Sequence, residues 1–320
     1  MTNGFLRLTV TQIETDDGFG GLGPVAGRVL RRLPGWVLIL LAGLWLLPVA
    51  GAFIASVRPW AFGRWTAWWT DLFNPSTWTL EPYRIALGAS ANNSFVEGMV
   101  NSFAIAIPST LVPLLIGSAA AYAIVWIPFR GSSALFFGLV ALIAVPVFGL
   151  LIPILQAFAS GVHLTLPVID KTMTLVPVMG LASSIPGVWL VHIGTQLPFA
   201  IFLLVYATAR VPRSLIDTAR LDGATAIQTY WRVVVPLITP TLAALGVLLF
   251  LWAWNDFVVA LTILGANGTA YPATVRFTSL STATDGPVTM AMVFIHSSVA
   301  LAVFFGLQRY FVRGLLTGIE

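Results

Sequence analysis

Long apolar runs separated by short polar segments dominate the chain from residue 35 onward. A helix needs roughly 20 consecutive apolar residues to cross the ~30 Å hydrocarbon core of a bilayer. Helices are expected because lipid offers no partner to backbone N–H and C=O groups. The pattern predicts an all-α polytopic membrane protein with six transmembrane helices. Their predicted ranges are 35–57, 99–126, 133–158, 186–208, 241–264 and 288–312.

Composition supports this class. Hydrophobic residues make up 58% of the 320 residues and charged residues 9%, whereas about a quarter of the residues of a soluble protein are charged. The chain has no cysteine, which excludes disulfides, thiolate metal ligands and cysteine nucleophiles. The three histidines lack metal-ligand spacing, so we expect no metal site. The basic residues are spread along the chain, so we expect no nucleic acid partner.

The distribution of basic residues predicts the orientation. Eleven arginines fall before the first span, after the second, after the fourth and after the sixth, against five basic residues in the other loops. Cytoplasmic loops are enriched in Lys and Arg, so we expect both termini and the loop over about 211–240 to be cytoplasmic. Residues 1–34 are predicted to form an N-terminal cytoplasmic extension, and residues 35–320 the transmembrane domain.

Prolines occur within several of the predicted spans. Each proline removes one backbone hydrogen bond, so we expect kinks at these positions. The residues concerned are Pro108, Pro113, Pro146, Pro153 and Pro198.

The loop between the fourth and fifth spans is amphipathic and reads DTARLDGATAIQTYWRVVVPL. Pro212 can begin a helix, and Gly223 permits a tight turn. Asp222 can accept backbone hydrogen bonds at the turn or cap the next helix, which Pro236 and Pro240 are expected to end. The loop therefore predicts a helix, a turn and a second helix. It is either an interfacial hairpin on lipid headgroups or a rigid element that inserts into a cytoplasmic partner.

The stretch PRSLIDTARLDGATAIQTYWRVVVPLITPTL resembles the EAA loop of ABC importer permeases. Asp217, Thr218 and Ala219 stand at the Glu-Ala-Ala positions, Gly223 at the glycine and Pro236 at the proline. This sequence departs from that pattern at two positions, because Asp217 stands in place of Glu and Thr218 in place of Ala. The stretches WTLEPYRIAL, WAWNDFVVALTIL and LQRYFVRGLLTG are similar to the carbohydrate-uptake branch, at the position of the smaller maltose-type permease subunit and closest to alpha-glucoside permeases.

This resemblance implies a type I ABC importer permease fold in a bacterial cell membrane. It also implies three kinds of partner, namely a homologous second permease, a dimer of ABC ATPase subunits and an extracytoplasmic solute-binding protein. The residues expected to couple to the ATPase are Asp217, Thr218, Ala219, Arg220, Asp222, Gly223, Ala224 and Pro236.

The energy source is expected to lie outside this chain. The only lysine, Lys171, lacks the glycines of a phosphate-binding G-x-x-x-x-G-K-[ST] loop. We therefore expect no enzyme activity and no cofactor in this chain, with ATP and Mg²⁺ bound by the ATPase subunits. The alternative function is a self-sufficient secondary transporter or channel for a small polar solute.

Four polar residues inside the predicted spans are candidates for the translocation path. His192 and Gln196 are four positions apart in the fourth span, and Asn255 and Asp256 are adjacent in the fifth. Polar groups in a bilayer are costly and need a partner or water. They either line a path for sugar hydroxyls or form interhelical hydrogen bonds and helix caps.

Overall fold

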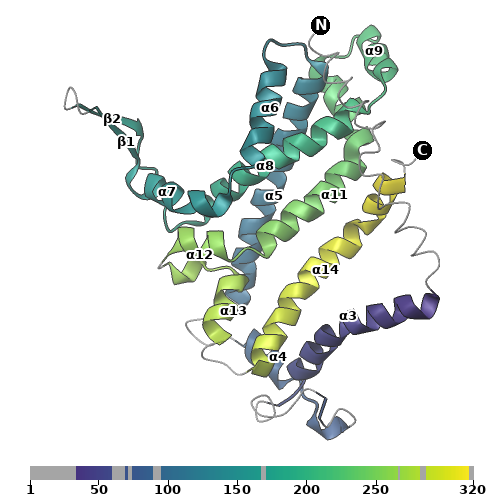
Figure 1. The fold of residues 1–320 in the computed structure, drawn as a ribbon, viewed down its shortest axis with the longest axis vertical. Coiled ribbons are helices and arrows are strands. Elements are labelled where there is room, and N and C mark those ends of the chain that lie inside the picture. Colours follow the sequence, from purple (N-terminus) through teal and green to yellow (C-terminus); the bar gives the residue numbers. More distant parts are fainter. Residues whose placement is uncertain are drawn as a thin grey trace. The chain divides into compact units, whose positions relative to one another are not determined.

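The computed structural model describes residues 34–59, 69–70, 74–88, 95–166, 171–265, 267–281 and 286–316 (Figure 1). Except for Pro34, the predicted N-terminal extension lies outside the described residues. The chain divides into two compact units. Unit 1 combines Met1–Ser94 with Phe277–Ser297, and unit 2 combines Phe95–Arg276 with Ser298–Glu320.

Unit 1 contains α3 (Gly35–Ser56), α4 (Glu81–Leu87) and the first turns of α14 (Gly286–Leu316). α3 is apolar all round and most of its side chains are exposed, as expected of a helix surrounded by lipid or by other membrane helices. At its C-terminal end, the Ser56 hydroxyl lies 2.9 Å from the Tyr83 hydroxyl of α4. This hydrogen bond joins the two helices.

Unit 2 is built on α5 (Phe95–Trp126), α8 (Ile185–Ala209) and α11 (Val235–Trp254), which pack side by side (Figure 1). A Cβ atom on Gly117 of α5 would lie 3.3 Å from the Ala200 Cβ of α8. Small residues of this kind let membrane helices approach closely. The other α-helices and strands of this unit are α6 (Ser132–Ile143), α7 (Val147–Ser160), β1 (Val162–Leu166), β2 (Lys171–Val176), α9 (Arg213–Leu221), α10 (Ala226–Thr229) and α12 (Val258–Leu264). α13 (Ala273–Ser281) has residues in both units.

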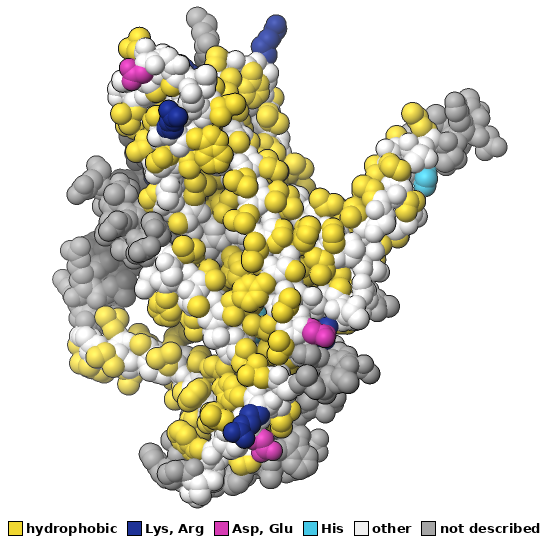
Figure 2. Space-filling view, turned by 180° about the vertical axis from the view of Figure 1, so that it is seen from behind, with side chains coloured by type: hydrophobic (Ala, Val, Ile, Leu, Met, Phe, Trp, Pro, Cys, Tyr) yellow, Lys and Arg dark blue, Asp and Glu magenta, His cyan; other side chains and the backbone are white. Residues whose placement is uncertain are grey.

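The membrane-spanning helices follow the sequence prediction in part. Among the described residues, five helices are long and apolar enough to cross a bilayer, and the α6–α7 pair gives a sixth if it is counted as one span. Figure 2 shows hydrophobic side chains over much of the face in view, with few charged groups among them. The all-helical class is confirmed, although the antiparallel β1–β2 hairpin was not predicted.

The predicted third span, 133–158, consists of two helices, and the kink expected at Pro146 is confirmed. α6 ends at Ile143, α7 begins at Val147, and the two helices are bent by 99°. Pro146 between them has φ −70° and ψ 115°, an extended conformation. Proline disfavours the helical conformation in the preceding residue and has no N–H of its own, which explains a break at this position.

The predicted fifth span, 241–264, is wrong as a continuous helix. α11 begins at Val235 and ends at Trp254, and α12 follows after a three-residue break. Pro236 and Pro240 do not end the preceding helix, because a π-helical turn over Tyr230–Val234 runs directly into α11. Pro236 is the second residue of α11, directly after the π-helical turn.

Other prolines lie within continuous helices, and Pro108 of α5 shows how one is accommodated. Because Pro108 has no N–H, the carbonyl oxygen of Ala104 four residues earlier loses its helical donor. The indole Nε1–H of Trp189 in α8 donates to that oxygen at 2.8 Å. The proline thus creates an interhelical hydrogen bond in place of an intrahelical one.

Candidate functional site

The segment Arg213–Thr229 forms the predicted helix, turn and helix, and we call it the α9–α10 hairpin. Gly223 between the helices has φ +79°, a conformation that favours glycine. The Ala224 N–H donates to the Ala219 carbonyl at 2.9 Å, closing the end of α9. The predicted turn at Gly223 is therefore confirmed.

The cap of α10 differs from the expectation. Thr225, not Asp222, is the N-cap residue, and it forms a capping box with Gln228. The Gln228 N–H donates to the Thr225 hydroxyl at 3.3 Å, and the Thr225 N–H donates to Gln228 Oε1 at 2.9 Å. Asp222 instead ends α9, where its own N–H donates to the Thr218 carbonyl. A capping box stabilises a helix as short as α10 at its first turn.

Charged groups of the hairpin are exposed. Asp217 lies 3.8 Å from Arg213 and 4.0 Å from Arg220, and about half of its side chain is exposed. Exposed pairs of this kind add only a few tenths of a kcal/mol to helix stability, so these groups remain available to another protein. Thr218, Asp222 and Gly223 are exposed as well, while Ala219 and Ala224 are half-buried.

The hairpin also exposes large apolar side chains. Leu221 is 88% exposed, Ile227 72% and Trp231, just beyond α10, 53%. Ile216 of α9 is fully buried. The base of the hairpin is buried, and its outer surface carries both apolar and charged side chains. Such a surface can contact lipid headgroups or a partner protein, so both interpretations made from the sequence remain open. Pro236 lies outside the hairpin, in α11.

The polar residues of the fourth and fifth spans meet in part. His192 and Gln196 lie on one face of α8 and are buried, with 2% and 0% of their surfaces exposed. The Asp256 carboxylate follows α11 and lies 3.6 Å from His192 Nε2. It accepts from the Val259 and Ala260 N–H groups at 3.2 and 2.9 Å, so it caps α12.

Two of these groups lack hydrogen bonds within the described part of the chain. They are His192 Nε2 and the whole side-chain amide of Gln196. Unpartnered buried polar groups are rare and point to water, a ligand or a different state of the protein. Asn255 is separate from them, because it is exposed and donates to the Leu251 carbonyl of its own helix at 2.8 Å.

A further polar contact involves residues near the N-terminus of α5. The Arg276 guanidinium is buried and lies 3.0 Å from the Glu97 carboxylate. Asn101 Nδ2 donates to the carbonyls of Thr269 and Tyr271 at 2.8 and 3.1 Å. From the sequence, Glu97 and Asn101 suggest only a helix cap, because nothing in their spacing indicates a partner so far along the chain.

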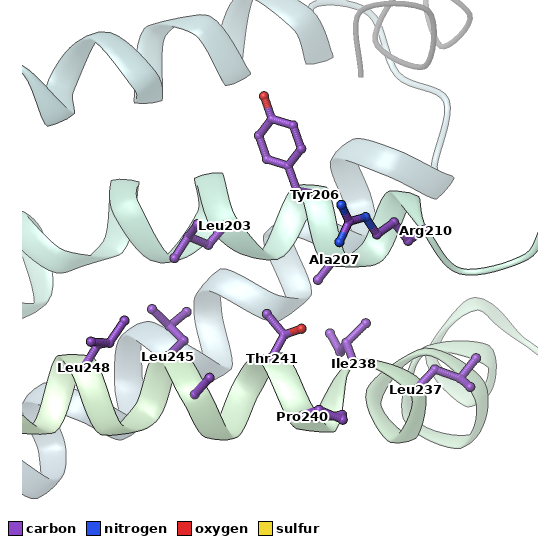
Figure 3. A pocket seen from close by; sticks show the side chains of 11 residues that line it. Leu203, Tyr206, Ala207, Arg210, Leu237, Ile238, Pro240, Thr241, Leu245 and Leu248 are labelled. Carbon is purple, nitrogen blue, oxygen red and sulfur yellow. The ribbon is translucent and has the colours of Figure 1, made fainter. Parts of the chain in front are cut away.

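A groove of about 400 Å³ lies between the C-terminal half of α8 and the N-terminal half of α11 (Figure 3). Its walls are mainly aliphatic, with Leu203 and Ala207 on α8 and Leu245 on α11. The Thr241 side chain extends toward α8, and Arg210 lies at one end (Figure 3). Sequence reasoning missed this groove, because apolar positions alone do not show where two helices separate.

Comparison with known proteins identifies the family. The chain matches the family described as binding-protein-dependent transport system inner membrane component over residues 113–317. It is 38% identical over 295 residues to the osmoprotective compounds uptake permease protein GgtD of Synechocystis sp., covering 90% of this chain and 92% of that protein. It is 39% identical over 246 residues to the alpha-glucoside transport system permease protein AglG of Rhizobium meliloti, covering 76% of this chain and 60% of that protein.

A solved structure shares the fold. It is a chain of a bacterial ABC transporter involved in the import of the acidic polysaccharide alginate, with a TM-score of 0.67 and 18% identity, covering 89% of this chain and 98% of that one. The type I ABC importer permease fold expected from the sequence is confirmed, as is the resemblance to ABC permeases that includes an alpha-glucoside permease. This chain therefore belongs to the family of inner membrane components of binding-protein-dependent transport systems.

Proposed function

We propose that this chain is a permease subunit of an ATP-driven importer for a carbohydrate, an alpha-glucoside or another oligosaccharide. It forms half of the translocation pathway, and a homologous second permease forms the other half. A dimer of ABC ATPase subunits binds ATP and Mg²⁺, and an extracytoplasmic solute-binding protein delivers the solute. The membrane is a bacterial cell membrane with both termini of this chain on the cytoplasmic side, as the arginine distribution supports.

The observation that carries the coupling role is the form of the α9–α10 hairpin. Its base is fixed by the fully buried Ile216, and its outer surface exposes Asp217 and Leu221. A rigid element with an exposed outer surface transmits a push from a partner to the helices that hold it. The residues proposed to meet the ATPase are Asp217, Thr218, Ala219, Arg220, Asp222, Gly223 and Ala224, with Pro236 at the start of α11.

The carbohydrate class is supported by the relatives. One is named for the transport of an alpha-glucoside, and one solved structure is that of an alginate importer. Hydroxyl-rich solutes need hydrogen-bonding groups along their path. We assign His192 and Gln196 to the path because they are buried polar residues with unused hydrogen-bonding capacity. We add Asp256, which lies 3.6 Å from His192, and the adjacent Asn255.

The test is reconstitution of the four kinds of subunit in vesicles with a radiolabelled alpha-glucoside. Uptake should require ATP, the ATPase dimer and the binding protein together. A panel with other oligosaccharides and a polyol identifies the solute class. Accumulation of solute against a gradient by this chain alone would show a secondary transporter instead, and the proposed function would be wrong.

A further inference from the structure

A buried pair of hydroxyls joins the α9–α10 hairpin to α5. Tyr230, the first residue after α10, places its hydroxyl 2.6 Å from the Ser118 hydroxyl in α5. Both residues are buried. They are 112 positions apart in the sequence, so this hydrogen bond links segments that the chain does not connect directly.

A π-helical turn directs Tyr230 toward α5. The turn covers Tyr230–Val234 and leads directly into α11. Single π-helical turns are rare and occur frequently at functional sites. The Tyr230 ring lies 5.5 Å from the Tyr122 ring of α5, measured between centroids, whereas the neighbouring Trp231 is 53% exposed. The turn thus presents one aromatic residue to α5 and the next one to the outside.

The hairpin touches α5 at a second point. Arg220 Nη2 donates to the carbonyl oxygen of Trp126, the last residue of α5, at 3.2 Å. A cavity of about 210 Å³ is lined by side chains from both sides, among them Tyr122, Trp126, Arg220 and Thr229. The contact with α5 therefore combines the packed Tyr122 and Tyr230 rings with two separate polar attachments, beside a pocket that is not filled by side chains.

We propose that Tyr230 and Ser118 are positioning residues that transmit movement of the hairpin to α5. This inference rests on the proposed coupling function and specifies where the force enters the bundle. The chain itself connects the hairpin to α8 and α11, and the hydroxyl pair adds a direct link to α5. From α5 the movement reaches α8 through the Trp189–Ala104 hydrogen bond and through the packing of the two helices.

The experiment uses the complete transporter in vesicles and measures ATP hydrolysed and solute imported in the same samples. Tyr230→Phe removes only the phenolic hydroxyl. Ser118→Ala removes its partner together with the bond from the Ser118 hydroxyl to the Leu115 carbonyl, 3.0 Å long. Ser109→Ala is the matched control, because Ser109 is buried in the same helix and its hydroxyl has no hydrogen-bond partner among the described residues. Tyr230→Phe keeps the ring, so the test does not depend on the folding of a more disruptive variant.

We expect Tyr230→Phe and Ser118→Ala each to lower the solute imported per ATP by about fivefold, the lower end of measured coupling effects. The double variant should be no worse than either single variant, since each breaks the same bond. Ser109→Ala should match the parent. Parental stoichiometry in Tyr230→Phe, or additive losses in the double variant, would overturn the inference. A parent complex without ATP-driven uptake would instead overturn the proposed function.

Discussion

His192 Nε2 of α8 lies 3.6 Å from Oδ2 of Asp256, in the break between α11 and α12. The same carboxylate caps α12 through two backbone N–H groups. One acidic side chain therefore stabilises the start of a short helix and faces the neighbouring long helix. The helix-cap alternative raised from the sequence is confirmed for Asp256, and its role in the path remains a prediction.

Asp256→Ala should destabilise the protein, because the N–H groups of Val259 and Ala260 lose their acceptor. Asp256 precedes the N-cap residue Phe257, and losing its bonds to the first-turn N–H groups should cost about 1 kcal/mol, as for an N-cap side chain. The thermal unfolding midpoint of the purified protein in detergent should fall. Asp222→Ala is the control, since that exposed residue is not the N-cap of α10, and it should leave the midpoint unchanged. Equal midpoints for both variants would contradict the capping role.

Alanine variants of the proposed path residues test transport separately from stability. Single changes at His192, Gln196, Asn255 and Asp256 should alter uptake modestly, because the binding protein is expected to select the solute. Gln196→Ala should have a larger effect than Asn255→Ala, since Gln196 is fully buried with unused hydrogen-bonding atoms. Initial uptake rates in reconstituted vesicles provide the measurement. If all four variants transport like the parent, these residues do not line the path.

Gly223→Val should uncouple ATP hydrolysis from transport. Nothing lies within 4 Å of a Cβ atom at this position, so the effect comes from the backbone at φ +79° and not from a clash. A side chain in that region of conformational space costs about 1–3 kcal/mol, which should shift the turn between α9 and α10. ATPase activity should persist while uptake falls.

Gly131→Val is a matched control for this prediction. Gly131 has φ +90°, and a Cβ atom added there would likewise have no neighbour within 4 Å, but the residue lies between α5 and α6. Its substitution should lower stability by a similar amount and keep transport coupled. Equal uptake in the two variants, at matched stability, would argue against a special role of the turn at Gly223.

Ala219→Arg should also uncouple the transporter. Ala219 is half-buried on α9, and a long charged side chain there would alter the surface proposed to meet the ATPase. Insertion into the membrane should be unaffected, because the hairpin lies between spans. The measurement is solute uptake by vesicles whose ATPase activity and protein content equal those of the parent. Normal uptake would place the ATPase contact elsewhere on the hairpin.

Trp189→Phe should destabilise the α5–α8 contact by about 1 kcal/mol, a typical value for an interhelical hydrogen bond in a membrane. The cost should be smaller in a Pro108→Ala background, because the alanine N–H would restore the helical donor to the Ala104 carbonyl oxygen. A double-mutant cycle on thermal or denaturant unfolding measures this coupling. Additive losses would show that Trp189 stabilises the helices through its ring alone.

The sequence by itself determined the apolar segments that can cross the membrane, the family and the turn at Gly223. These properties follow from local chemistry, because apolar length, proline spacing and the conformational freedom of glycine act within a few residues. Even so, local signals could not show that Pro146 breaks a span whereas Pro108 does not. At Pro108, the indole of Trp189 on another helix donates to the Ala104 carbonyl oxygen, and this partner cannot be found from the neighbouring sequence.

Only the tertiary structure decided which polar groups meet. His192 and Asp256 belong to different helical segments, and Ser118 and Tyr230 lie 112 positions apart. Their contacts depend on the packing of whole helices against one another. The type of a residue determines which bonds its side chain can form. The position of its partner is set by helix packing, which no short stretch of sequence encodes.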